Sequence, residues 1–300
     1  MTGIDRLIRD RPVLSYFVLT FIVSWSLLLL IGGYDLFSGV DWDASSVFGL
    51  AIIAMLTGPT VASLVLTARL AGRAGVRDLF SRLRRWRVDI RWYAVALVTA
   101  PVVVLAVNLG LWLTSSAFRP PILSDEAGAV ALLAGLGVGL TTVLEELGWT
   151  GFAVPRLRLR HTAFTTAVIV GVIWAAWHLI QIIWVGSSTA EGVPMAPYLA
   201  VYFLFAVASL TAYRVLMVWV HDATGSLFVV TLMHASYAAC TLPIGLLVPK
   251  LTGSDLLVQG GALSAALWLV VAAVALLKRQ EAMTQATPPS PAPPAAARSL

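Results

Sequence analysis

The sequence predicts an all-α, polytopic membrane protein with about eight transmembrane helices and both termini in the cytoplasm. Composition, long apolar runs and the placement of charge each support this fold class. Of the 300 residues, 59% are hydrophobic and only 12% are charged, whereas a soluble domain carries about 25% charged residues. An integral membrane protein follows from that difference.

Apolar runs of membrane-spanning length recur from one end of the chain to the other. Each is long enough to cross a hydrocarbon core of about 30 Å. The first is longer than the apolar core of a secretory signal peptide, which has about 7–15 residues, so we expect a retained helix. In chain order the expected spans are 13–31, 47–70, 93–113, 130–152, 163–184, 198–220, 226–247 and 261–277.

Two of the expected spans carry signals for close contacts between helices. Pro59 follows Gly58 in the second span, and the N–H that proline lacks predicts a kink whose free carbonyl a neighbouring helix satisfies. In the fourth span, Gly135 and Gly139 have the GxxxG spacing that lets another helix approach closely.

Two segments are not expected to span the membrane. Residues 76–88 place apolar side chains three or four apart with arginines between them, a pattern typical of a short interfacial helix in the headgroup region. A flexible basic loop is the alternative, and nucleic acid is not expected as a partner. Residues 284–300 are too rich in proline and alanine to fold alone. We therefore expect one transmembrane domain over residues 1–283, in contact with the lipid bilayer, and a disordered tail.

The basic residues predict how the protein is oriented. Except for Arg119 and Lys250, every lysine and arginine falls on the side of the membrane that eight spans assign to the two termini. Arg214, near the sixth span, is counted with this group. The positive-inside rule makes that side cytoplasmic, so we expect a multi-pass protein of the cell membrane. The single cysteine, Cys240, excludes an intramolecular disulfide framework.

Four ionisable side chains lie inside apolar spans: Glu145, Glu146, His178 and His234. A charge near the bilayer centre costs about 2.5–3.5 kcal/mol on insertion scales, so these residues predict a functional site. Adjacent residues on a helix point about 100° apart, so the two glutamates are not expected to share a role, nor both to be ionised at such close range. Residue counts from the span ends allow the histidines to meet Glu145 at middle depth. This combination indicates a proton-transfer or metal-assisted hydrolytic site.

Several other residues have plainer interpretations. His221 is expected to cap a helix or lie at the surface, and His161 is expected to be solvated in a basic loop. HExxH, GxSxG and GxGxxG motifs are absent from the sequence, so the zincin, serine-hydrolase and dinucleotide-binding classes have no motif support. Three tryptophans in the same expected span as His178 are expected to be core or interface aromatics rather than substrate contacts: Trp174, Trp177 and Trp184.

The segments around the ionisable residues resemble the motifs of the CPBP intramembrane proteases. This family comprises the type II CAAX prenyl endopeptidases and bacterial relatives linked to bacteriocin processing and immunity. EELGWT at 145–150 resembles the first motif, EExxxR; WAAWH at 174–178 resembles FxxxH; and HASYA at 234–238 resembles HxxxN or HxxxD. The resemblance covers residues 135–241, with the motifs in order on separate expected spans.

The resemblance implies an endopeptidase, a hydrolase that cleaves a peptide bond of a membrane-associated protein or peptide from the cytosolic side. Carried over by position, Glu145 would activate the attacking water and His178 would hold or deprotonate it. His234 would stabilise the oxyanion, and Glu146 would support the site. Glu145, His178 and His234 would also be a plausible Zn²⁺ set, whereas a metal-free glutamate base would work as well. A bacterial plasma membrane is the implied location.

Three positions depart from the family motifs. Thr150 replaces the arginine expected to orient a glutamate, and Trp174 replaces phenylalanine. Ala238 replaces the Asn or Asp that would supply a second oxyanion donor, and loss of such a donor costs about 10²–10³ in rate. Ser236 or Tyr237 could stand in for it.

Two further classes of function stay open. A catalytically weakened relative would act as a peptide-binding immunity or chaperone-like membrane protein. A proton-coupled transporter would use the glutamates and histidines as a relay, although the sequence lacks the paired broken helices that support such a mechanism. The oligomeric state is not predicted.

Overall fold

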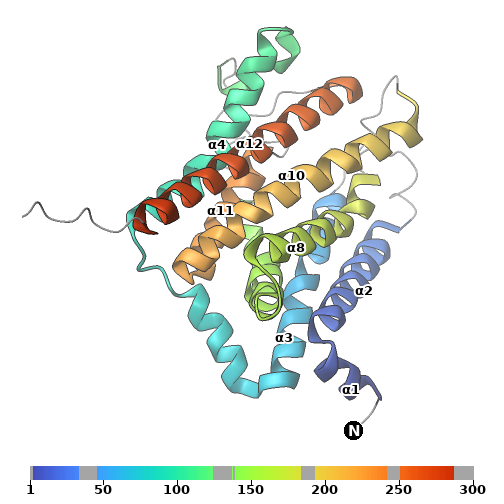
Figure 1. Ribbon diagram of the computed structural model, residues 1–300. Helices are drawn as coiled ribbons and strands as arrows, with labels where there is room; N and C mark the ends of the chain where they lie inside the picture. The colour runs from blue at the N-terminus through green and yellow to red at the C-terminus, as the bar shows by residue number, and fades with distance from the viewer. Residues whose placement is uncertain are drawn as a thin grey trace, which may run out of the picture.

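Helices make up all of the regular structure in the described part of the chain. The computed structural model describes residues 3–33, 46–123, 137, 139–183, 193–241 and 251–286. Within these ranges the elements are α-helices, with short 3₁₀ segments and one π-helix. Figure 1 shows long helices packed side by side, with the N-terminal helix α1 (Gly3–Asp10) at one end of the bundle. The predicted all-α class is confirmed.

Five of the described helices are long and apolar enough to cross a membrane. Two shorter apolar helices, α8 (Ala163–Trp177) and α11 (Leu227–Thr241), pack among them. The protein is therefore a multi-pass membrane protein, while the count of eight spans and the side of the termini stay predictions. The five long helices are α2 (Pro12–Gly32), α3 (Ser46–Leu83), α4 (Ile90–Trp112), α10 (Met195–Thr224) and α12 (Gly253–Ala286).

The fourth predicted span, 130–152, contains a change of helix type. From residue 143 onward the chain forms α6 (Val143–Gly148) and the π-helix η5 (Trp149–Ala153), and α7 (Val154–Leu157) follows beyond the predicted end of the span. A π-helical turn inside an α-helix is rare and often marks a functional site. Between α4 and this region are two 3₁₀ turns, η3 (Ser116–Phe118) and η4 (Pro121–Leu123).

The predicted interfacial helix at 76–88 overlaps the last part of α3, and its position at the membrane surface stays a prediction. Helix α3 runs on to Leu83 with a bend at Gly72, whose φ of 60° lies in the left-handed region open to glycine. Leu79 beyond the bend is buried against Leu147 and Leu227, so its apolar side packs on protein rather than only on lipid headgroups. Residues 84–89 are not helical.

Helix α12 extends farther than the sequence indicates. It ends at Ala286, so the first three residues of the predicted disordered tail, 284–300, are helical. The remainder of that tail lies outside the described residues.

Proline kinks in two long helices are satisfied by serines of neighbouring helices. Pro59 frees the carbonyl of Met55 in α3, and Ser24 on α2 donates its hydroxyl to that oxygen at 2.7 Å. Pro101 is likewise inside α4, and the carbonyl four residues before it, at Leu97, accepts a hydrogen bond from α11 at 3.0 Å. The predicted compensation at Pro59 is confirmed, and it ties α2 firmly to α3.

Close backbone approach explains two glycines near the predicted site. A Cβ at Gly148 would lie only 2.6 Å from the carbonyl oxygen of Pro59, so glycine lets α6 pack directly on α3. A Cβ at Gly139 would lie 3.3 Å from Ala235 on α11. Its GxxxG partner, Gly135, lies outside the described residues.

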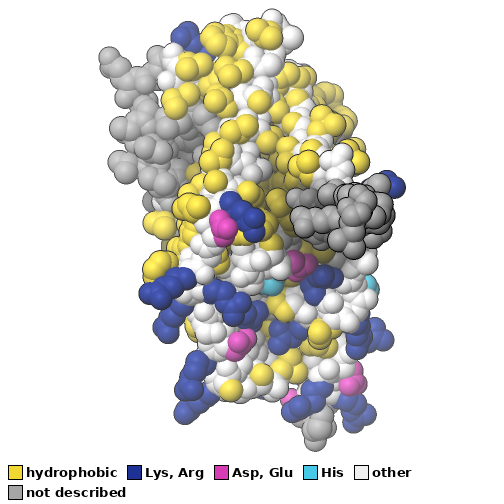
Figure 2. Space-filling model, turned by 60° about the vertical axis from the view of Figure 1, so that its left-hand side comes forward, with side chains coloured by type: hydrophobic (Ala, Val, Ile, Leu, Met, Phe, Trp, Pro, Cys, Tyr) yellow, Lys and Arg dark blue, Asp and Glu magenta, His cyan; other side chains and the backbone are white. Residues whose placement is uncertain are grey.

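Two apolar clusters hold the bundle together. One joins α2, α3, α8 and η5, and the other joins α4, α10, α11 and α12. Figure 2 shows basic side chains gathered toward one end of the face in view, with hydrophobic side chains over the rest. This arrangement agrees with a membrane-embedded body and one basic end.

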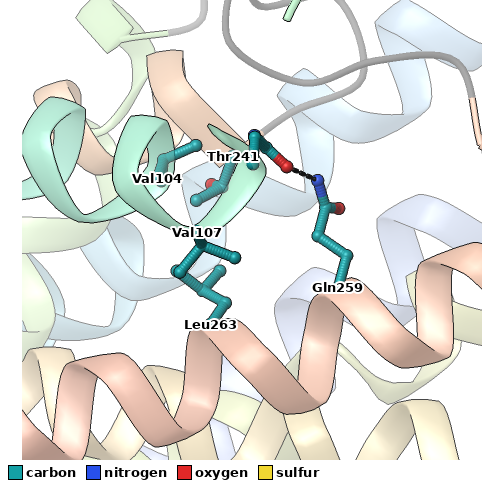
Figure 3. Close-up of a pocket in the computed structure, with 6 residues that line it drawn as sticks. Val104, Val107, Thr241, Gln259 and Leu263 are labelled. Atoms are coloured by element: carbon teal, nitrogen blue, oxygen red, sulfur yellow. Dashed lines mark hydrogen bonds between the residues drawn. The ribbon is translucent and has the colours of Figure 1, made fainter. Parts of the chain in front are cut away.

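A small cavity, lined by both aliphatic and polar side chains, lies between α4 and α12, as Figure 3 shows. Gln259 donates its side-chain N–H to the Asn108 carbonyl oxygen at 2.7 Å, and Thr241 also lines the space. The cavity, of about 20 Å³, has room for one water molecule. The hydrogen bond between Gln259 and Asn108 links α12 to α4. None of the predicted site residues lines the cavity.

Replacing Ser24 tests the compensation at the proline kink. Ser24→Ala leaves the Met55 carbonyl without its donor in an apolar environment, and we expect a loss of about 1 kcal/mol in the free energy of unfolding. Unfolding in mixed micelles by SDS titration measures it. Ser15→Ala is the matched control, because Ser15 on the same helix donates only to the Arg11 carbonyl at an exposed position. Equal losses in the two variants would contradict the assignment.

Candidate intramembrane active site

Both glutamates of the first motif are buried on α6, with 4% of Glu145 and 0% of Glu146 exposed. The sequence places hydrogen-bonding residues four positions later, one turn along the helix. Trp149 donates its indole N–H to Glu145 at 3.3 Å, and the Thr150 hydroxyl donates to Glu146. The two carboxylates diverge, and each meets a different set of neighbours.

Glu146 is the more heavily bound carboxylate. Arg214 on α10 donates from Nη1 to Oε2 and from Nη2 to Oε1, both at 3.0 Å. His234 on α11 contacts Oε1 through Nδ1 at 2.9 Å. Because both oxygens are occupied and both members of the ion pair are fully buried, Glu146 is suited to hold other groups in place rather than to react.

Glu145 has one oxygen held and one oxygen facing a histidine. Its Oε2 accepts the indole N–H of Trp174 on α8 at 2.7 Å, in addition to that of Trp149. Its Oε1 lies 3.9 Å from Nε2 of His234. This separation is too long for a direct hydrogen bond, and a water that bonds to both atoms would lie beside the line that joins them.

The hydrogen bonds of the two histidines indicate which ring nitrogen of each carries a proton. A carboxylate that is paired with a guanidinium accepts hydrogen bonds, so Nδ1 of His234 carries the proton shared with Glu146. Nδ1 of His178 lies 2.9 Å from the carbonyl oxygen of Trp174, which can only accept, so this nitrogen also carries a proton. In both rings Nε2 is the atom left for chemistry.

Aromatic packing fixes the rings around the cluster. The Trp174 indole meets the His234 ring edge-on at 4.9 Å and the His178 ring at 5.6 Å. Trp177 packs edge-on against His178 at 4.7 Å. The histidines of the second and third motifs are therefore joined through one tryptophan, on which both rings pack.

Two residues of this cluster have different roles from those that the sequence predicts. Arg214 was counted among the basic residues on the cytoplasmic side, and this is wrong. Its side chain, on α10, is fully buried within the protein. Trp174 is more than a core aromatic, since its indole binds Glu145 directly. A signal for Arg214 is present in the sequence, because a charge inside the expected span 198–220 calls for the same explanation as the glutamates.

The structure shows whether other side chains replace the motif residues missing at positions 150 and 238. Thr150 donates to Glu146, and the guanidinium expected at its position comes from Arg214 on another helix. The two stand-ins considered for Ala238 are engaged outside the cluster. The Ser236 hydroxyl donates to the Leu97 carbonyl on α4, and the Tyr237 ring stacks on Tyr213 at 4.2 Å.

The other histidines singled out in the sequence take no part in these contacts. His161 is exposed in the loop after α7, as expected. His221 is largely buried at the end of α10, 3.8 Å from Asp222, which pairs with Arg158 at 3.0 Å. Trp177 is fully buried, while Trp184 lies outside the described residues. Cys240 is a buried free thiol.

The proposed zinc ligands do not form a three-ligand group in this arrangement. Among the residues that the structure describes, no set of three or more His, Cys, Asp or Glu side chains is placed to hold a metal ion. One oxygen of Glu145 is bound by two indoles, and Nδ1 of His178 is bound by a backbone carbonyl. Zinc binding at these residues stays a prediction.

The fold and this cluster define a multi-pass helical membrane protein with a buried carboxylate–imidazole site. Residues 126–240, which include both glutamates and both histidines, match the family model described as type II CAAX prenyl endopeptidase, Rce1-like. A relative, CAAX prenyl protease 2 of Methanococcus maripaludis, is 26% identical over 181 residues, or 58% of this chain. The chain spans 63% of that relative's length. These matches support membership of the CPBP family of intramembrane proteases.

The different partners of the two glutamates predict different effects on stability. Glu146→Gln leaves the Arg214 guanidinium buried without its counter-charge, and breaking a buried ion pair in this way costs about 3–5 kcal/mol. Glu145→Gln is the matched control on the same helix, and we expect it to cost much less because its direct partners are neutral indoles. SDS-titration unfolding compares the variants, and equal stability of the two would refute the division of roles.

Proposed function

We propose that the protein is an intramembrane endopeptidase that hydrolyses a peptide bond of a membrane-associated protein or peptide. The observation that carries this proposal is the 3.9 Å gap between Oε1 of Glu145 and Nε2 of His234. A general base and an electrophilic donor face each other there, with their other polar atoms already bound. The family match supports the same class of reaction.

Glu145 is the general base in this mechanism. Its Oε1 takes a proton from a water molecule bound beside the carboxylate as the water oxygen attacks the scissile carbonyl carbon. The indoles of Trp174 and Trp149 hold the other oxygen, so the carboxylate keeps its orientation. The same carboxyl group then delivers the proton to the departing amine, which completes the hydrolysis.

The two histidines have separate roles. His234, oriented by Glu146, donates from Nε2 in its protonated form to the oxyanion that develops on the scissile carbonyl. His178 has its Nδ1 fixed on the Trp174 carbonyl, and its free Nε2 helps to hold the attacking water. Glu146 stays bound to the guanidinium throughout and does not exchange a proton with the substrate.

A peptide-binding protein without turnover is the second candidate. The observation that favours it is the replacement of the motif Asn or Asp by Ala238, together with the engagement of Ser236 and Tyr237 elsewhere. One oxyanion donor rather than two would slow hydrolysis by about 10²–10³. Binding that survives Glu145→Gln, without any cleavage, would support this candidate.

New protein termini in host membranes reveal proteolysis even while the substrate is unidentified. Membranes carrying wild type, Glu145→Gln or His178→Ala are compared by mass spectrometry of N- and C-termini. We expect termini that occur with wild type and fall by about 10² or more in both variants, because one variant removes the general base and the other removes the group that holds the attacking water.

His161→Ala is the control, because that histidine is exposed and should leave the termini unchanged. Identical termini with wild type and Glu145→Gln, in cells that require the gene, would refute the endopeptidase proposal.

The indole of Trp174 gives a second test of the mechanism. Trp174→Phe installs the motif residue and keeps an aromatic ring, but removes the N–H that holds Glu145. Because a hydrogen bond to a charged group is worth about 1.5–3 kcal/mol, we expect turnover to fall about tenfold to a hundredfold. Trp177→Phe is the matched control, since its buried indole N–H has no hydrogen-bond partner among the described residues. A larger loss in the control would contradict the role of Trp174.

A further inference from the structure

Arg214 reaches the proposed active site from a helix that carries none of the family motifs. Its side chain is fully buried on α10, and its fork of N–H groups spans both oxygens of Glu146 at 3.0 Å. Nη1 also lies 3.3 Å from the Thr150 hydroxyl, which donates to the same carboxylate. Two parallel bonds fix the plane of a carboxylate as well as its position.

One path leads from this guanidinium to the proposed oxyanion donor. The Glu146 oxygen that accepts Nη2 of Arg214 also accepts Nδ1 of His234 at 2.9 Å. The orientation of the imidazole therefore depends on a carboxylate whose plane is set by the guanidinium. The opposite nitrogen of that ring is the one that faces Glu145.

A second path leads to the proposed general base. The Arg214 guanidinium carbon lies 4.3 Å from the centre of the Trp174 ring, within the range of a cation–π contact. That indole donates to Glu145 at 2.7 Å. The same cation thus packs against the group that holds the base and binds the group that holds the oxyanion donor.

We propose that Arg214 is the positioning residue of the active site, setting His234 through Glu146 and Glu145 through Trp174. The inference rests on the proposed endopeptidase function. Stability alone is a weak explanation for the residue, because replacing a buried ion pair by apolar residues is often neutral or stabilising. Thr150 and Trp174, two departures from the family motifs, both contact Arg214, so they form one coupled arrangement.

Substitutions of Arg214 separate positioning from folding. Turnover is measured with the purified full-length protein on the substrate identified from the new termini. For Arg214→Met we expect kcat to fall by about 10²–10³ with KM little changed, because the buried side chain contacts no substrate. Arg214→Lys keeps the charge without the fork and should fall between wild type and Arg214→Met. Arg158→Met, a change of the same kind outside the cluster, should leave kcat unchanged.

Moving the guanidinium to another position distinguishes a positioning role from a purely structural one. Position 150 lies in η5, four residues after Glu146, and its threonine already donates to that carboxylate, so an arginine there can reach the same group. We expect the exchange variant Thr150→Arg/Arg214→Thr to recover most of the kcat lost in Arg214→Met. Thr150→Arg alone should be slower than wild type, because two guanidinium groups then compete for one buried carboxylate.

The outcomes distinguish failure of the inference from failure of the proposed function. Turnover that persists in Glu145→Gln overturns both. The inference alone is overturned if turnover depends on Glu145 but folded Arg214→Met or Arg214→Lys keeps the wild-type kcat. It is also overturned if the exchange variant folds and is as slow as Arg214→Met. If none of the Arg214 variants folds by size-exclusion chromatography and SDS titration, the residue is structural and the inference is likewise overturned.

Discussion

The ion pair between Glu146 and Arg214 is the interaction on which the rest of the site depends. Two adjacent carboxylates in an apolar bundle repel each other and are costly to desolvate. The guanidinium compensates one of them, and both of its bonds to the carboxylate are made without solvent exposure. With Glu146 bound in this way, Glu145 is the carboxylate available for the proposed role of base, and we expect the two glutamates to have different functions.

Helix geometry explains how neighbouring residues acquire such different surroundings. Glu145 points toward α8, where Trp174 binds it, and Glu146 points toward α10 and α11. The helix then passes into a π-helical turn and remains in close contact with α3 because position 148 is glycine. Three separate helices can therefore supply one partner each to a two-residue motif.

Much of the fold was predictable, because lipid demands long apolar helices and their lengths are visible in the chain. The first three expected spans agree closely with α2, α3 and α4, and the kink at Pro59 is compensated as expected. The bend at Gly72 was not predicted, since a glycine in an amphipathic run can also continue a helix. The packing of Leu79 on α6 and α11 depends on that bend, and an interfacial helix has the same apolar spacing.

The sequence by itself determined the class of protein and pointed to the candidate reactive groups, because burying a carboxylate or an imidazole in lipid is costly without a role. It also showed that Thr150, Trp174 and Ala238 differ from the family motifs. Only the tertiary structure decided what the first two differences mean, since Arg214 lies 68 residues from Glu146 along the chain. An ion pair between distant helices follows from packing, and the spacing of residues in a single chain does not reveal packing.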